Sequence, residues 1–290
     1  MKNILPSLAF LAALLSATNG AGQGTAENPL APTPQQSPAA QSARRVLAET
    51  GLEAKIRHRV VHGGHELIGV GLYQQSGGGP EKMVRWEMKT QLDEQTVTYQ
   101  QLAGERYFWI RKDLPLGKKQ LQRVNLWQFR DAVRRVVVSN PQHAANSWLM
   151  LGGLARLMEE IDHGFTFGPP RESALGKVPV LIVEGEWKPE TRAGLDVPVG
   201  RNPEHFPSRV TLTLGNDDVF PMFPYRIEYS RPASGAGQGS EPESLMTLEF
   251  YEVRRRGDLD PRSFEYNPGD QEVEDITRQY LLRLGLATGG

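Results

Sequence analysis

Three histidines lie within eight residues of the stretch RHRVVHGGHELIGVGLY: His58, His62 and His65, with Gly63-Gly64 between the last two. Imidazole nitrogens are common ligands of transition metals, so the stretch is a candidate metal site. A Gly-Gly pair also suits the two-residue turn of a β-hairpin, because glycine readily adopts positive φ. The same residues therefore fit either a metal site or a tight turn between strands.

The hairpin interpretation can be worked out residue by residue. With Gly63-Gly64 as the turn, His62 faces His65, and the further pairs are Val60 with Leu67, His58 with Gly69, Ile56 with Gly71 and Ala54 with Tyr73. His58 is then about 13 Å from His62 along the strand. A zinc ion lies only about 2.0 to 2.1 Å from each nitrogen that binds it. We therefore predict no metal centre, with histidines at the open end of a sheet.

The same register places Gly69 and Gly71 on the inward face of the second strand. Glycine within a strand removes side-chain volume and is typical of a bend or of the close approach of another group. We expect a curled sheet with space on its inner side.

No other motif predicts catalysis. The chain lacks nucleophile elbows, zincin helices, phosphate loops and dinucleotide fingerprints. Grouped acids occur at Glu159, Glu160 and Asp162, at Asp217 and Asp218, and at Asp258 and Asp260, where turn capping is the usual role. We predict no catalytic residue and no cofactor. A hydrolase would need His62, His65 or Asp218 to meet another ionisable group.

Composition limits the partners. The 290 residues include 33 basic and 34 acidic side chains, a net charge of -1, so no overall field attracts nucleic acid. There is no cysteine, and hence neither a disulfide nor a cysteine for lipid anchoring. Residues 1–21 have the pattern of a signal peptide, which predicts export to the periplasm or the extracellular space. Residues 22–41, rich in Pro, Ala and Gln, are expected to be a flexible linker.

The remainder, residues 42–287, reads as a single α+β domain. Successive runs alternate apolar and polar residues, as in EKMVRWEMKTQL and RVTLTLG, which predicts one large antiparallel sheet. Two amphipathic helices are expected within an insertion at 126–161, the second carrying Trp148, Leu151 and Leu154, and a third over 270–286. We expect the inserted helices to cover the concave face of a half-open, strongly curved sheet.

The order of several motifs resembles the LolA-like and LolB-like lipoprotein-sorting superfamily. The motifs are GVGLY, RWEM, GERYFWI and FPYRIEY, then a final strand followed by Phe264, Tyr266 and the turn Pro268-Gly269. The resemblance covers Leu52 to about Arg123 and Val210 to Ile276. It implies a half-open antiparallel barrel with a helical lid that holds acyl chains of lipids or lipoproteins in the periplasm, without catalytic residues. Two features depart from the pattern: the segment from Leu126 to Arg201 is long, and no single residue matches the family's lid-locking arginine.

We therefore expect an exported, non-enzymatic carrier or sensor for an acyl chain or another apolar ligand. The predicted lining of its cavity is Val84, Trp86, Met88, Phe108, Trp148, Leu151, Leu154, Val210, Leu212, Tyr225 and Ile227. Two alternatives remain open: an envelope interaction module with a filled core, which would recruit membrane-associated envelope proteins, and a hydrolase with an unrecognised site. An empty interior would favour the carrier, whereas a packed interior would favour the interaction module.

Overall fold

The computed structural model of the protein describes residues 36–62, 65–79, 81–92, 94–135, 147–189, 191, 207–232, 242–257, 259–283 and 286. The predicted signal peptide lies outside these residues, as does most of the predicted linker. The helices and strands of the described part, in chain order, are α2 (Pro38–Ala48), β1 (Gly51–His62), β2 (His65–Ser76), β3 (Met83–Leu92), β4 (Gln95–Ala103), β5 (Tyr107–Asp113), η2 (Pro115–Gly117), β6 (Lys119–Asn125), α3 (Leu126–Arg135), α5 (Leu154–Gly164), β7 (Phe165–Phe167), β8 (Arg171–Leu175), β9 (Val178–Trp187), β10 (Arg209–Gly215), β11 (Pro224–Arg231), β12 (Glu243–Arg255), η4 (Pro261–Phe264), β13 (Glu274–Asp275) and α7 (Thr277–Arg283).

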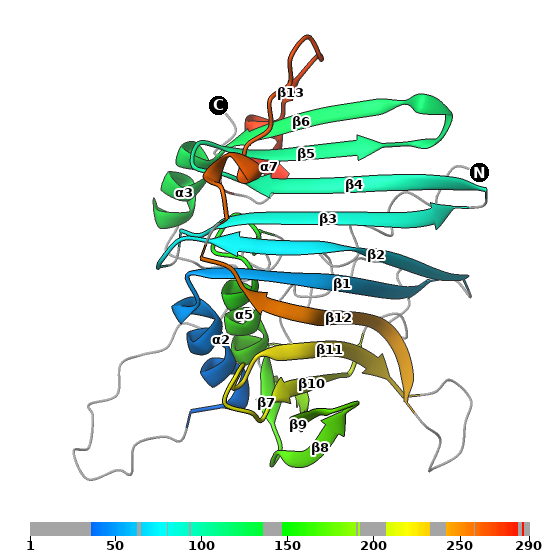
Figure 1. The fold of residues 1–290 in the computed structure, drawn as a ribbon, viewed down its shortest axis with the longest axis vertical. Helices are drawn as coiled ribbons and strands as arrows, with labels where there is room; N and C mark the ends of the chain where they lie inside the picture. The colour runs from blue at the N-terminus through cyan, green and yellow to red at the C-terminus, as the bar shows by residue number, and fades with distance from the viewer. Residues whose placement is uncertain are drawn as a thin grey trace.

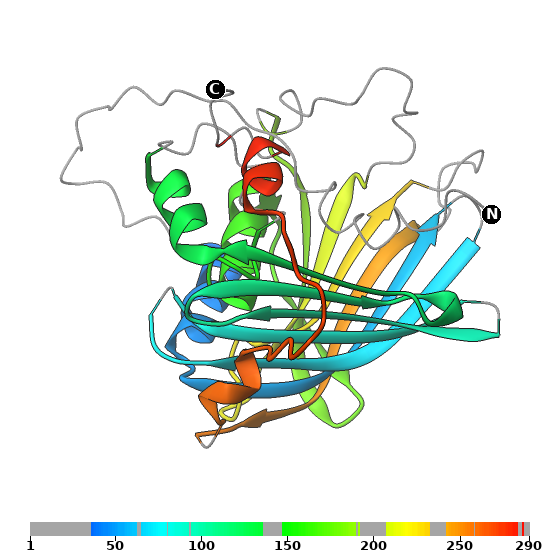
Figure 2. The same cartoon turned by 90° about the horizontal axis from the view of Figure 1, so that it is seen from above.

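The described strands form one open, mostly antiparallel sheet. Its order is β13-β6-β5-β4-β3-β2-β1-β12-β11-β10-β9-β7, and β8 pairs with β9 beside this path. The two ends of the order do not pair, so the sheet curls without closing into a barrel (Figures 1 and 2). The predicted α+β class with a curved antiparallel sheet agrees with this arrangement. Within the described residues no helix is both long and apolar enough to cross a membrane.

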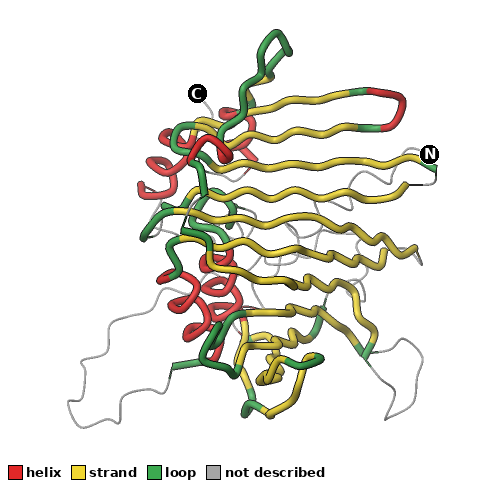
Figure 3. Tube along the Cα trace, viewed as in Figure 1, coloured by secondary structure: helices red, strands yellow, loops and turns green. Residues whose placement is uncertain are grey.

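The α-helices gather at one end of the strands, whereas the short η2 lies at the other end, between β5 and β6 (Figure 3). Helix α2 packs against α5, and its buried residues, Ala39, Ser42, Ala43 and Val46, recur at three or four residues along one face. Small side chains in this stripe let the two helices approach closely. Helix α3 contacts α7 at the opposite edge, where Phe129 and Tyr280 meet at a ring-centroid distance of 6.1 Å.

The folded part begins earlier than the sequence predicts, with helix α2. It starts at Pro38, within the predicted linker of residues 22–41, whereas the folded part was expected from Ser42. The reason is local: the Ser37 hydroxyl accepts a hydrogen bond from the Ala40 amide, and Pro38 is compatible with the first helical turn. Ala39 is fully buried in the main apolar core, and the Ser37 hydroxyl donates a hydrogen bond to the Asp162 carboxylate of α5. These contacts tie this turn to the domain.

The C-terminal prediction of one helix over 270–286 is wrong in part. Glu274 and Asp275 form the short parallel strand β13 beside β6, and the helix begins only at Thr277. The Asp275 carboxylate accepts a hydrogen bond from the Thr277 amide and binds the Arg123 guanidinium. These contacts hold Asp275 in the sheet, so helical geometry cannot start before it.

The segment between β12 and β13 crosses the outer face of the sheet. Tyr266 packs on Trp109 with ring centroids 5.7 Å apart, and together with Val273 and Tyr107 it covers a small cluster of Leu102, Trp109 and Leu121. Figure 2 shows this strap passing around the edge of the sheet before it enters α7. Phe264, at the end of η4, is fully buried. The strap therefore protects an apolar patch of the outer face.

Candidate functional site

The inner face of the sheet carries one continuous apolar core, which we call the concave-face cluster. It includes all the residues predicted as cavity lining except Leu151, which is partly buried and packs against it. They come from β3 (Val84, Trp86, Met88), β5 (Phe108), the turns at 147–153 (Trp148, Leu151), the start of α5 (Leu154), β10 (Val210, Leu212) and β11 (Tyr225, Ile227). The structure thus brings them together on one face.

The prediction that one helix carries Trp148, Leu151 and Leu154 is wrong, because only Leu154 belongs to a helix. Residues 147–153 form turns, and α5 begins at Leu154. Gly152 and Gly153 adopt φ values of 121° and 71°, a region that favours glycine and ends regular helix geometry. The apolar spacing of three or four residues continues across this break, which explains the misassignment.

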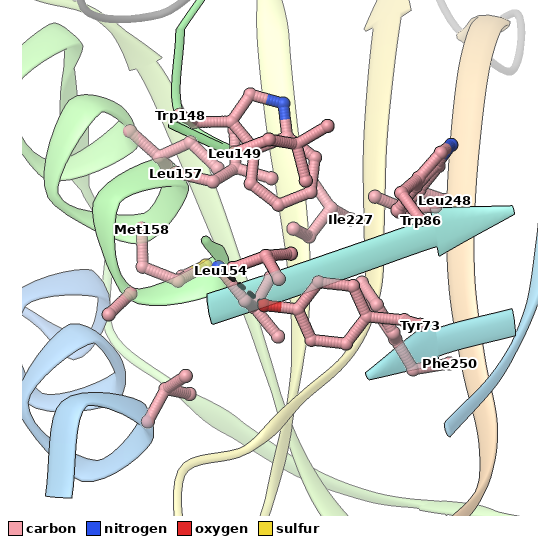
Figure 4. Close-up of a cluster of buried hydrophobic side chains, with 14 of the residues drawn as sticks. Tyr73, Trp86, Trp148, Leu149, Leu154, Leu157, Met158, Ile227, Leu248 and Phe250 are labelled. Atoms are coloured by element: carbon pink, nitrogen blue, oxygen red, sulfur yellow. Dashed lines mark hydrogen bonds between the residues drawn. The ribbon is translucent and has the colours of Figure 1, made fainter. Parts of the chain in front are cut away.

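Aromatic rings fill the centre of the cluster (Figure 4). The Trp86 and Trp148 rings meet edge to face at 5.5 Å, Tyr73 stacks on Trp148 at 6.3 Å, and Tyr73 meets Phe250 edge to face at 5.7 Å. Such pairs add to the stabilisation from burial alone. At this point the space beneath residues 147–153 is packed rather than empty.

Tyr73 also provides a polar connection between the sheet and its helical layer. Its hydroxyl accepts a hydrogen bond from the Leu154 amide, at 2.9 Å (Figure 4). It also donates one to Gln75 Oε1, at 2.9 Å. Gln75 in turn donates to the carbonyl oxygens of Val46 and Glu49. Burial raises the pKa of Tyr73 above its usual value, so the hydroxyl stays protonated. One hydroxyl therefore satisfies the first amide of α5, which a helix leaves unpaired.

The histidine stretch forms the predicted hairpin with the predicted register. His62 pairs with His65, Val60 with Leu67, His58 with Gly69, Ile56 with Gly71 and Ala54 with Tyr73. The turn Gly63-Gly64 and the side chain of His62 lie outside the described residues. His65 is exposed. Across the described part of the chain, no group of three or more His, Cys, Asp or Glu residues is placed to hold a metal ion.

His58 is the unusual member of this stretch. Only 7% of it is exposed, and its Nε2 atom is buried without a hydrogen-bond partner. Burial lowers the pKa of His58 from 6.5 to about 4, so the imidazole is neutral at pH 7. A second such atom on the same face is the hydroxyl of Tyr229, which is 1% exposed. Buried polar atoms without partners are rare and call for an explanation.

The two inward glycines have different neighbours. A Cβ on Gly71 would overlap with the backbone carbonyl of Glu87 in β3, so the strands approach too closely for any side chain. A Cβ on Gly69 would instead meet the Met88 Cε and, at 2.8 Å, the Thr90 Oγ1. The predicted close approach is therefore confirmed at Gly71, whereas the position above Gly69 is filled by the flexible end of Met88.

The grouped acids have structural roles where the structure describes them. Asp217 Oδ1 accepts from the amides of Val219 and Phe220, and Asp260 Oδ1 accepts from the Arg262 amide. Both are the turn caps that the sequence predicts. Asp218 follows β10 near Phe223, whereas His65 begins β2, and the strand pairing places these two positions at opposite ends of the sheet.

Glu160 is a buried acid on α5, 7% exposed, and it forms ion pairs with Arg156. Burial raises the pKa of Glu160 from 4.5 to about 7, and the nearby Arg156 opposes this shift. The folded protein therefore takes up a proton at Glu160 at a higher pH than the unfolded chain does, which stabilises the fold as the pH falls from about 7 to 4.5.

His58 and Glu160 should give opposite pH dependences of stability. Because the pKa of His58 is lowered from 6.5 to about 4, the unfolded chain binds the proton first, and the fold loses stability as the pH falls through this window. Between pH 7 and pH 5 each shift corresponds to a change on the order of 2 kcal/mol. On lowering the pH from 7 to 5, we expect the free energy of unfolding of His58→Leu to rise relative to that of the native chain. That of Glu160→Gln should fall relative to that of the native chain.

Urea denaturation of the three proteins at pH 7 and pH 5 checks this prediction. The native chain is the control, since all other groups titrate alike in it and in the variants. Identical pH dependences in all three proteins would contradict the assignment.

Sequence reasoning missed the residues at the centre of the face. Tyr73 on β2 and Phe250 on β12 connect the two groups of predicted strands, and both are almost fully buried. The alternation within LMTLEFYEVRRR and the hairpin register already place Phe250 and Tyr73 on definite faces. What the sequence lacks is the pairing of β12 with β1, which brings these faces together.

Comparison with known proteins gives matches among solved structures only. No family model matches the sequence, and no curated protein does. The chain is similar to the crystal structure of a DUF1329 family protein from Desulfovibrio piger, with 13% identity and a TM-score of 0.33 over 79% of this chain and 95% of that one.

It is also similar to the structure of an outer membrane lipoprotein-sorting protein domain from Vibrio parahaemolyticus. Here the identity is 10% and the TM-score 0.30, over 78% of this chain and 94% of that one. A third match, to PNGF-II, has 7% identity and a TM-score of 0.23, and covers 33% of that chain.

Proposed function

We propose that the protein is an exported, non-enzymatic carrier or sensor that binds an acyl chain, of a lipid or a lipoprotein, on the concave face of its sheet. The observation that carries this proposal is the continuity of the concave-face cluster. It extends from Val210 on β10 across Phe250 and Tyr73 to Phe108 on β5. A long apolar strip of this kind matches the shape of an acyl chain, whose burial contributes about 0.8 kcal/mol per methylene.

The cover of this strip is a separate element rather than part of the sheet. Residues 147–153 lie over Tyr73 and Trp86, and Gly152 and Gly153 precede α5 with positive φ. The Leu154 amide bonds to a side chain of the sheet, the Tyr73 hydroxyl. A ligand would enter by displacing Trp148 from its contacts with Tyr73 and Trp86, and the two glycines supply the backbone freedom for that movement.

The N-terminal pattern of residues 1–21 supports export. In this setting the partners would be lipids, lipoproteins and the envelope proteins that deliver or receive them.

Binding is tested on purified full-length protein. We expect an organic extract of the protein to contain acyl lipid by mass spectrometry. We also expect the delipidated protein to bind a fluorescent acyl chain, offered as the free acid and as its glyceryl ester, with competition by the unlabelled compound. A lipid-free extract together with no binding of either form would overturn the proposal.

A second candidate, an envelope interaction module, is favoured by one observation. The described centre of the core is filled by Trp86, Trp148 and Tyr73, as a purely structural core would be. The outer face of β2 also exposes Ile68 and Val70, at 49% and 46%, as a small apolar patch. If the binding test fails, substitution of Ile68 and Val70 by serine followed by pull-down from envelope extracts tests this alternative.

A further inference from the structure

The surroundings of His58 are apolar on every side that the strand pairing defines. Along β1 its same-face neighbours are Ile56 and Val60, which are 0% and 3% exposed. Leu248 lies opposite on β12 and Gly69 opposite on β2. None of these residues offers a hydrogen-bond partner from its side chain. The buried Nε2 atom therefore faces a part of the concave-face cluster that leaves it unsatisfied.

Gly69 leaves the position opposite His58 on β2 without a side chain of its own. A Cβ built on Gly69 would meet the end of Met88 and the Thr90 hydroxyl. Methionine is unbranched and flexible, so its terminal methyl group can move at little cost. If Met88 Cε moved aside, a group about the size of a carbonyl could lie beside the imidazole over the bare backbone of Gly69.

We propose that the ligand of the concave face is a neutral acyl ester, and that His58 Nε2–H donates a hydrogen bond to its carbonyl oxygen above Gly69. This inference rests on the proposed function and adds the chemical class of the ligand. The acyl chain would continue along the strip, and Met88 would move aside when the ester arrives.

The preference for an ester over a free acid follows from charge. The same-face neighbours of His58 carry no charge, and the low pKa of His58, about 4, keeps the imidazole neutral. A carboxylate beside it would be buried without a cation, which is costly. An ester carbonyl accepts the same hydrogen bond without a charge.

Tyr229 provides a matched comparison. Its hydroxyl is also buried without a partner, but its neighbours on both adjacent strands, Val210 and Met246, have side chains that occupy the flanking positions. The register places Tyr229 two strands and two residues from His58, about 12 Å away, so one carbonyl cannot bond to both. Tyr229→Phe removes an equally buried polar atom without touching the proposed site.

The test measures binding of a glyceryl monoester and of the free fatty acid, both with the same fluorescent acyl chain, at pH 7. We expect the native protein to bind the ester at least tenfold more tightly. His58→Leu should weaken ester binding about five- to tenfold, the effect of one lost hydrogen bond. His58→Gln, which keeps a donor, should restore most of it, and Tyr229→Phe should bind like the native chain.

The outcomes separate this inference from the proposed function. If both ligands bind equally and His58→Leu changes neither affinity, the protein is an acyl carrier but the ester assignment is overturned. If Tyr229→Phe, rather than His58→Leu, abolishes the preference, the assignment is likewise overturned. Loss of all binding in the native chain would instead overturn the proposed function. Since leucine removes an unsatisfied polar atom, His58→Leu is expected to fold, and urea denaturation at pH 7 verifies this.

Discussion

Gly71→Ala is expected to lower the free energy of unfolding by about 3 kcal/mol or more, among the largest effects of a single methyl group in this protein. The added Cβ would overlap with the carbonyl oxygen of Glu87, a backbone atom in the middle of the sheet. Relief would require β2 and β3 to separate, and therefore the loss of strand hydrogen bonds. Denaturation by urea, followed by circular dichroism, measures the change.

Gly69→Ala is the matched control, two residues away on the same strand and the same face. There the Cβ would meet the Met88 methyl group and the Thr90 hydroxyl, both at side-chain ends. We expect a loss of about 1 kcal/mol, within the usual range for overpacking that a flexible neighbour can absorb. Equal effects of the two substitutions would show that the strands do not approach more closely at Gly71.

Trp148→Ala is expected to destabilise the protein by about 3 to 5 kcal/mol, the range for deletion of a buried aromatic ring. Trp148 is 4% exposed and contacts both Tyr73 and Trp86 from residues 147–153. Its removal leaves a cavity between the cover and the sheet, which apolar dyes should enter. Urea denaturation and fluorescence of an added apolar dye test both effects.

Trp127→Ala on α3 is the control, because 71% of that side chain is exposed. It should change the free energy of unfolding by no more than about 0.5 kcal/mol. A loss from Trp148→Ala as small as that from Trp127→Ala would contradict the packing of residues 147–153 on the concave face.

Local patterns in the sequence predict a good part of this structure. The Gly63-Gly64 pair limits the hairpin loop to two residues, and this fixes the pairing of His58 with Gly69 and of Ile56 with Gly71. The alternation of apolar and polar residues predicts the inner faces of β3, β10 and β11, because successive side chains of a strand point to opposite faces of the sheet. This local rule fixes the face of each predicted strand residue, whereas the pairing of β12 with β1 brings the two groups of strands together.

The errors arise where distant contacts decide. The spacing of apolar residues runs through Gly152-Gly153, so a helix was expected where Trp148 packs from turns instead. Asp275 is held in β13 by Arg123, far away in the sequence, and this shortens the last helix. The unsatisfied Nε2 of His58 likewise cannot be predicted from the sequence, because it depends on the pairing of β1 with β12, which places Leu248 opposite His58.

The location of the bound acyl chain is the most direct test of the central claim. Bromine atoms quench tryptophan fluorescence at short range, so a glyceryl ester of a dibrominated fatty acid reports which indoles it touches. We predict saturable quenching in the native protein, most of it lost in a Trp86→Phe, Trp148→Phe double variant and retained in Trp127→Phe. Quenching that survives in the double variant, or that is absent from the native protein, would contradict acyl binding on the concave face.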